Sequence, residues 1–341
     1  MKFKSFLLLT VFCFSWKVFS KDTLVTPKWS SKKQPFSIQI QSEYFNTTSN
    51  YKLLGEYQNL TKENFLTYVS NNLSADYSFF PWLNVEAFFN TMWASSFTDN
   101  TLRNKFGITH SGLGFSLLHR FSYFQVGLGF KGGAPLHQIY PQTDEIVLGD
   151  GAYFANYHLT FAYEHPSKLF HIFYNTNFLY RSFGLSSILF NNIGLNFNTS
   201  VINAGLAAQF FMSALSQDTY THSPNTRWSI TDRVNGGSYK FYSVNPGALS
   251  FTGWIEWKLR SMNFKVYTNI DTYGQNYAKG MTLGMVTRLK WNTKKRAKSY
   301  SEQIMKNRKI NSKSKRYLKE DDDENSVPIN KELMEELKQL R

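Results

Sequence analysis

Apolar and polar residues alternate along three stretches near the end of the chain, 250–260, 263–271 and 281–291. Side chains on a strand point alternately to opposite faces, so each stretch has one apolar and one polar face. Each stretch is about ten residues long, the length of a tilted strand that crosses a membrane. Charged residues share a face with Gly, Asn and Thr, and the other face is apolar and aromatic. This pattern predicts a barrel that is closed in lipid, apolar outside and polar inside.

The same alternation elsewhere in the chain predicts an all-β fold. The expected architecture is a transmembrane antiparallel up-and-down β-barrel of about twelve strands, an even number as in single-chain bacterial barrels. The predicted strands cover residues 36–44, 65–79, 82–97, 109–121, 122–131, 152–164, 169–182, 187–199, 201–212, 249–260, 262–273 and 280–291.

The connections between these strands support the same architecture. Every second connection is tight, at Pro81 and at residues 121–122, 165–167, 198–200 and 260–262. The others are mostly longer, at residues 46–64, 98–108, 132–151 and 214–246, although 183–186 is short. Outer-membrane barrels have short periplasmic turns and longer external loops. Both termini are therefore expected in the periplasm.

The first twenty residues have the pattern of a secretory signal peptide. Lys2 and Lys4 precede an apolar centre at 6–14, and Ser20 stands before the expected cleavage point. The only cysteine, Cys13, lies inside this segment, so the mature chain is expected to hold neither a disulfide nor a thiolate ligand. A secretory signal together with barrel strands predicts the outer membrane of a Gram-negative bacterium.

The remaining chain divides into three expected parts: an N-terminal periplasmic segment at 21–35, the barrel at 36–291 and a charged, partly helical or disordered periplasmic tail at 292–341. The tail has a basic run at 294–319 and then an acidic run at 320–324. A solvated tail and a contact arm for an envelope partner both fit this pattern. The net charge of +14 is uneven, and the compartment makes nucleic acid an unexpected partner.

The polar face of the predicted strands carries many ionisable residues. An ionisable side chain at membrane depth must face water or a partner. Two interpretations follow, a network of paired side chains that fills the lumen and a wet passage through it. The candidate pore-lining residues are Glu86, Lys131, His158, Glu164, His171, Arg181, Glu256, Lys258, Arg260, Lys265, Asp271 and Arg288.

Lipid hydrolysis is the catalytic alternative. Outer-membrane lipid hydrolases use His and Ser with an orienting Asn or acid. The candidate residues are at 110–111 and 222–225, but Gly112 and Leu113 follow the first pair where the His-x-Ser-Asn pattern would continue. We therefore expect no catalytic residues. No spacing of His, Asp or Glu predicts a metal or a cofactor.

Two short stretches resemble known outer-membrane proteins. The last predicted strand, with Met285, Leu289 and the final Trp291, resembles the signal that barrel-insertion machinery reads, which implies that machinery and membrane lipid as partners. Residues 148–151, Leu-Gly-Asp-Gly, enter a tyrosine-rich strand and resemble a stretch of the uptake channels for hydrophobic and aromatic compounds. This resemblance implies transport.

Three hypotheses for function follow from the sequence. The first is a channel that passes small polar or amphipathic solutes through the charged, Gly- and Asn-rich lumen. The second is a structural or interaction barrel that acts through its loops and its periplasmic tail, with a blocked lumen. The third is the lipid hydrolase. The structure of the connection at 214–246 does not follow from its sequence.

Overall fold

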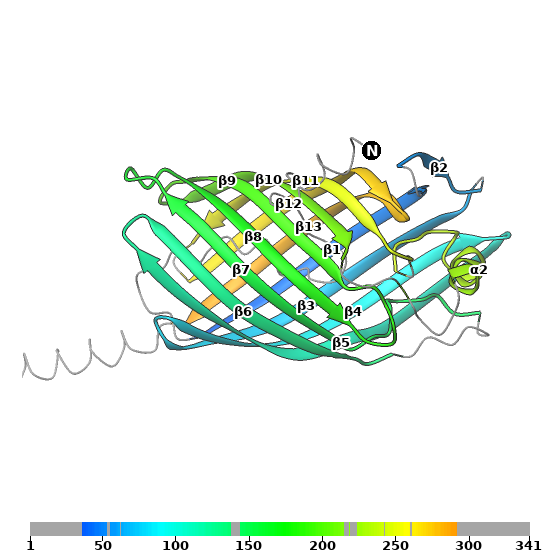
Figure 1. Ribbon diagram of the computed structural model, residues 1–341, viewed down its shortest axis with the longest axis horizontal. Coiled ribbons are helices and arrows are strands. Elements are labelled where there is room, and N and C mark those ends of the chain that lie inside the picture. The colour runs from blue at the N-terminus through cyan, green and yellow to red at the C-terminus, as the bar shows by residue number, and fades with distance from the viewer. Residues whose placement is uncertain are drawn as a thin grey trace, which may run out of the picture. The chain divides into compact units, whose positions relative to one another are not determined.

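The computed structural model describes residues 36–52, 55–61, 63–137, 144–214, 218, 224–241, 243–259 and 261–291. These residues form one closed β-barrel, shown from the side in Figure 1. The expected signal peptide, the N-terminal segment and the tail at 292–341 lie outside the described residues. No helix in the described part is long and apolar enough to span a membrane.

The barrel has the predicted twelve strands, joined in chain order by antiparallel pairing (Figure 1). A thirteenth, three-residue strand, β2 (Tyr57–Asn59), pairs with the end of β1. The all-β prediction and the strand number are therefore confirmed. The barrel strands are β1 (Phe36–Tyr51), β3 (Phe65–Phe80), β4 (Leu83–Thr98), β5 (Thr101–Phe121), β6 (Phe124–Pro135), β7 (Phe154–Glu164), β8 (Phe170–Arg181), β9 (Ile188–Asn198), β10 (Ile202–Ser213), β11 (Gly247–Lys258), β12 (Met262–Gln275) and β13 (Tyr277–Trp291).

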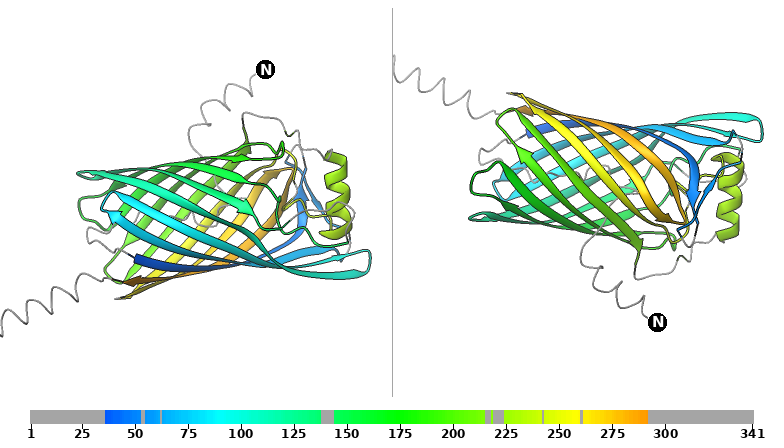
Figure 2. Two further views of the ribbon diagram at one scale, coloured as in Figure 1. Left: turned by 90° about the horizontal axis from the view of Figure 1, so that it is seen from below. Right: turned by 90° about the horizontal axis from the view of Figure 1, so that it is seen from above.

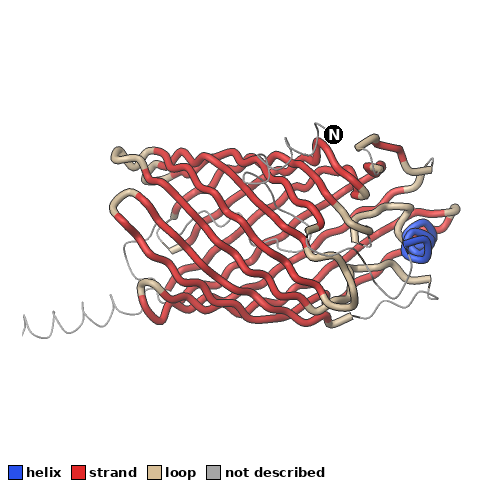
Figure 3. Tube along the Cα trace, in the orientation of Figure 1, coloured by secondary structure: helices blue, strands red, loops and turns tan. Residues whose placement is uncertain are grey.

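The first and last strands close the sheet. β1 pairs with β13 from Phe36 opposite Trp291 to Tyr51 opposite Tyr277, with one bulge between Thr47 and Ser49. Closure leaves no barrel strand with an unpaired edge, which is the condition for a sheet to stand in lipid. Figure 3 shows the unbroken wall of strands, with one helix, α2 (Pro224–Val234), at the end of the barrel.

The two faces of the wall differ as the alternation predicts. Large apolar side chains point outward, including Ile255 and Leu283, which are 44% and 46% exposed. The residues between them point inward and are buried, for example Glu256 and Thr282. The apolar face is therefore the outer face, and the polar face lines the interior.

Glycines on the inner face make room for large rings on the neighbouring strand. A Cβ atom on Gly284 would overlap the ring of Tyr267 on β12, and one on Gly205 would overlap the ring of Trp254 on β11. The small residues and the large rings are therefore complementary halves of one packing arrangement across adjacent strands.

One predicted connection is wrong. Residues 98–108 are not a long loop, because β5 begins at Thr101 and pairs with β4 from its first residue. The turn is Asp99-Asn100, and both residues have positive φ angles, 51° and 59°. Two-residue turns of this kind match the twist of a hairpin, and Asp and Asn tolerate them. The hairpin extends past the end of β6, whose last residue, Pro135, pairs with His110 (Figure 2).

A charge on the outer face should disrupt the barrel only within the lipid band. Leu283→Arg places a cation in the middle of β13, and we expect it to lower the free energy of unfolding by about 2–4 kcal/mol. The measurement is the folded fraction of barrel refolded in lipid, followed by gel mobility with and without heating.

The matched control is Leu102→Arg, which makes the same change at an exposed residue near the tip of the β4–β5 hairpin. We expect little effect there. Equal tolerance of both substitutions would show that the outer face does not contact lipid.

Candidate functional site in the barrel lumen

The structure places the predicted pore-lining residues on the inner face. Eleven of the twelve lie in the described residues at inward positions of their strands: Glu86, Lys131, His158, Glu164, His171, Arg181, Glu256, Lys258, Lys265, Asp271 and Arg288. Arg260 lies outside the described residues. Their role in lining a pore stays a prediction.

Several of these residues are paired with each other or with inner-face amides. Lys131 on β6 lies 3.1 Å from Glu86 on β4, and its ammonium group lies 4.1 Å from the centroid of the Phe88 ring. Glu256 accepts a hydrogen bond of 3.0 Å from the Asn203 amide. Part of the inner wall is therefore a network of paired side chains.

The end of the barrel with the tight turns carries partly exposed charged side chains. Arg120 at this end is half exposed and pairs with Glu164. Lys290 donates a hydrogen bond of 2.6 Å to Asn263, and neither residue is fully buried. The cation of Arg120 is therefore partly exposed at this mouth, whereas the Glu164 carboxylate beside it is buried.

Two connections pack against the inner wall at the opposite end of the barrel. We call them the loop plug: the inserted segment at 144–152, between β6 and β7, and residues 224–246, between β10 and β11, as far as they are described. Figure 2 shows α2 of the second connection at this end. The plug and the inner faces of β1, β3, β4 and β13 share one apolar cluster: Phe45, Leu66, Tyr68, Met92, Ala94, Ile146, Val147, Leu148, Ile230, Val234, Phe241 and Ala278.

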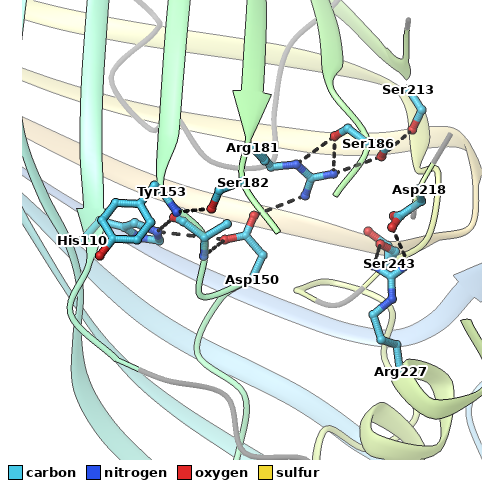
Figure 4. Close-up of polar contacts among 11 residues, drawn as sticks. His110, Asp150, Tyr153, Arg181, Ser182, Ser186, Ser213, Asp218, Arg227 and Ser243 are labelled. Carbon is cyan, nitrogen blue, oxygen red and sulfur yellow. Dashed lines mark hydrogen bonds and ion pairs between the residues drawn. The ribbon is translucent and has the colours of Figure 1, made fainter. Parts of the chain in front are cut away.

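A buried ion pair ties the inserted segment to the wall. Arg181, the last residue of β8, lies 3.2 Å from the Asp150 carboxylate, and both side chains are almost fully buried. The same guanidinium donates to the Ser186 carbonyl from Nε at 3.0 Å and from Nη2 at 2.8 Å. On the other side of Asp150, His110 of β5 lies 4.0 Å from the carboxylate and 3.3 Å from the Ala152 carbonyl (Figure 4).

The two parts of the plug also bind each other. The amide of Asn235 accepts from the Val147 N–H at 3.0 Å and donates to the Val147 carbonyl at 3.4 Å. On the wall side, Ser96 donates to the Val234 carbonyl at 2.5 Å. Asn50 of β1 donates to the Gly237 carbonyl at 2.6 Å. Backbone groups that the helix leaves unpaired at its end are thus satisfied by the barrel.

A second buried ion pair lies within the β10–β11 connection. Arg227 on α2 lies 2.8 Å from Asp218 (Figure 4). Its guanidinium also lies 3.5 Å from the Ser243 carbonyl. No sequence pattern predicts this arrangement, because the partners of Arg227 are nine and sixteen positions away in a connection with no periodic pattern.

The described residues do not assemble the predicted hydrolase site. His110 points inward and contacts the inserted segment, while the next residue on the strand, Ser111, points to the opposite face. These two side chains therefore cannot form a nucleophile–base pair. His222 and Ser223 lie outside the described residues. Among the residues that are described, no three His, Cys, Asp or Glu side chains group as metal ligands would.

Comparison with known proteins supports the channel fold. No family model matches the chain, and no curated protein matches its sequence. The COG4313 outer membrane channel from Pseudomonas putida F1 matches with a TM-score of 0.61 and 11% identity, over 78% of this chain and 98% of that one. This chain is similar in fold to an outer-membrane channel. The resemblance predicted from the sequence is thereby confirmed for the fold.

Two further barrels match less closely. The NanC porin has a TM-score of 0.44 and 5% identity, over 74% of this chain and 100% of its own. The CymD monoaromatic hydrocarbon channel has a TM-score of 0.41 and 9% identity, over 76% of this chain and 90% of its own.

The buried ion pair should hold the inserted segment in place. Arg181→Met leaves the Asp150 carboxylate buried without its partner, and we expect a loss of about 3–5 kcal/mol in the stability of the plugged state. The measurement is the rate at which protease cleaves the 144–152 segment in the folded barrel.

Arg103→Met is the matched control, because Arg103 of β5 pairs at 2.9 Å with Asp144 of the same connection, whose side chain is 66% exposed. An exposed pair contributes less than about 1 kcal/mol, so cleavage should change little. Equal cleavage of the two variants would contradict a special role for the buried pair.

Acid should weaken the packing of the 144–152 segment through protonation of His137, which follows β6. Burial, and next the charge of His110, lower the pKa of His137 below its ordinary value of 6.5, although Asp150 acts in the opposite direction. A released ring binds a proton more readily than a packed one, so the plugged state loses stability as the pH falls below 6.5.

Protease cleavage of the segment should therefore rise between about pH 7.5 and about pH 5, and His137→Gln should flatten that rise. Protection that improves with acid, or a rise that is unchanged in His137→Gln, would reject the contribution of His137.

Proposed function

We propose that this protein is a bacterial outer-membrane channel that passes small polar or amphipathic solutes and is closed here by its loop plug. The polar inner wall carries the proposal. Charged and amide side chains line a barrel whose outer face is apolar, and a wall of this kind suits water and polar solutes. The fold shared with the COG4313 outer membrane channel supports the same function.

The closed state follows from burial. Inner-face residues such as Asn192, Asn196 and Asn269 are almost completely inaccessible, whereas the wall of an open aqueous channel would be wet. A solute can pass only if groups that cover the wall move. The inserted segment is the natural moving part, because its apolar residues and one buried ion pair hold it rather than a strand ladder.

Orientation and partners follow from this function. The loop plug then faces the outside of the cell, and the tight turns and the tail at 292–341 face the periplasm. Barrel-insertion machinery and outer-membrane lipid are the partners of assembly. The interaction-barrel hypothesis stands beside the channel, since the buried lumen is also what it predicts.

Planar-bilayer recording of the refolded barrel tests the channel. We expect rare openings for the natural sequence and frequent openings when 144–149 are replaced by Gly and Ser, because Ile146, Val147 and Leu148 then leave the apolar cluster. Arg103→Met should behave like the natural sequence. An absence of conductance in the opened variant would reject the channel.

A truncation after Trp291 separates the two hypotheses. If the protein is a channel, the truncated barrel should insert and conduct like the full chain. If it is an interaction barrel, the truncated form should insert but lose an envelope protein that the full chain retains in a pull-down.

A further inference from the structure

A row of amide side chains crosses the inner wall on three adjacent strands. Asn175 of β8 pairs directly with Asn192 of β9, and Asn192 pairs with Gln209 of β10. Their exposed fractions are 4%, 0% and 1%. We call these three residues the amide row. Asn177, two positions along β8, lies on the same face.

The amides in this row lack the partners that buried amides usually have. The Nδ2 and Oδ1 atoms of both Asn175 and Asn192 are buried and accept or donate no hydrogen bond, and the same is true of Asn177. The Oε1 atom of Gln209 is in the same condition. A buried polar group without a hydrogen bond destabilises the fold, so a cluster of them is costly.

Elsewhere on the inner wall two amides do make hydrogen bonds, although the Oδ1 atoms of Asn156, Asn196 and Asn203 are also buried without a partner. Asn269 of β12 accepts a hydrogen bond of 2.6 Å from Thr252 of β11, and Asn203 donates one of 3.0 Å to Glu256. The amide row differs from these residues because both amide atoms of Asn175 and of Asn192 lack a partner. Leucine would fit the positions of Asn175 and Asn192 without leaving polar atoms unpaired.

The neighbours of the row along its own strands are aromatic. Phe173, Phe190 and Phe211 lie two positions from Asn175, Asn192 and Gln209 on their strands, and all three rings are buried on the same face. Across from Gln209 the row continues into Ser250 of β11 and then Asp271 of β12. An anion would find no positive partner in the row itself.

These features match one class of solute. An amide offers a donor and an acceptor without charge, and so does a hydroxyl group. Phenyl rings beside the amides suit the apolar face of a small ring, while its hydroxyl edge meets the amides. We propose, on the basis of the channel function above, that the amide row is a selectivity site for neutral hydroxylated solutes of monosaccharide size.

Swelling of proteoliposomes tests this site. The probes are arabinose, which is neutral and hydroxylated, and glycine, which is small and zwitterionic. All barrels carry the Gly and Ser replacement of residues 144–149 so that the plug does not limit entry. Asn175→Leu with Asn192→Leu should lower the ratio of arabinose to glycine entry at least about fivefold, because hydroxyl groups then lose two of the three amides of the row. The same double variant should keep or raise the thermal unfolding midpoint, since it removes unpaired buried groups.

Asn269→Leu is the matched control. It breaks the hydrogen bond with Thr252, so it should lower the unfolding midpoint and leave the entry ratio unchanged. An unchanged ratio in the Asn175→Leu, Asn192→Leu variant would overturn the selectivity site while the channel stands. Failure of both probes to enter any of these barrels would overturn the channel function, and the site with it.

Discussion

The fold depends on closure of one sheet by the hydrogen bonds between β1 and β13. Lipid offers no partner for backbone N–H and C=O groups, so a sheet can stand in a membrane only if every strand has two neighbours. The pairing from Phe36–Trp291 to Tyr51–Tyr277 supplies this condition along nearly the whole height of the wall. The charged side chains of the wall are then placed mainly inward, because the outward face is mostly apolar. The amides, charges and glycines of the lumen are therefore consequences of closure as well as candidates for function.

The interior combines two kinds of packing. At the loop end, an apolar cluster and the Arg181–Asp150 pair bring the inserted segment into contact with the wall. Farther inside, rings lie over glycines of the next strand, and amides line the neighbouring strands. The first kind stabilises a closed state and the second leaves hydrogen-bonding capacity unused. A protein selected only as a rigid barrel would have little reason to retain the unpaired amides of Asn175 and Asn192.

Much of this architecture could be predicted because side chains of a barrel strand face the outside and the lumen alternately. Apolar and polar residues therefore alternate along the sequence with a period of two. Leu283 and Thr282 show opposite exposure as their alternation requires. The β4–β5 hairpin was missed because the Asp99-Asn100 turn is only two residues long and the residues after it alternate less clearly. The loop plug was missed for a different reason. Leu148 and Val234 are apolar residues in connections. No local sequence pattern indicates that they pack against the inner faces of β1, β3, β4 and β13.

The most direct measurement of the central claim uses single cysteines on β12, introduced one at a time from Val266 to Asp271 in a mature chain expected to contain no other cysteine. Each is spin-labelled in lipid, and collision with oxygen, which concentrates in the bilayer, is compared with collision with a water-soluble nickel complex. The account predicts high oxygen access at Val266, Thr268 and Ile270 and low access at the residues between them. Equal oxygen access at all six positions, or the opposite alternation, would contradict a barrel with its apolar face in lipid.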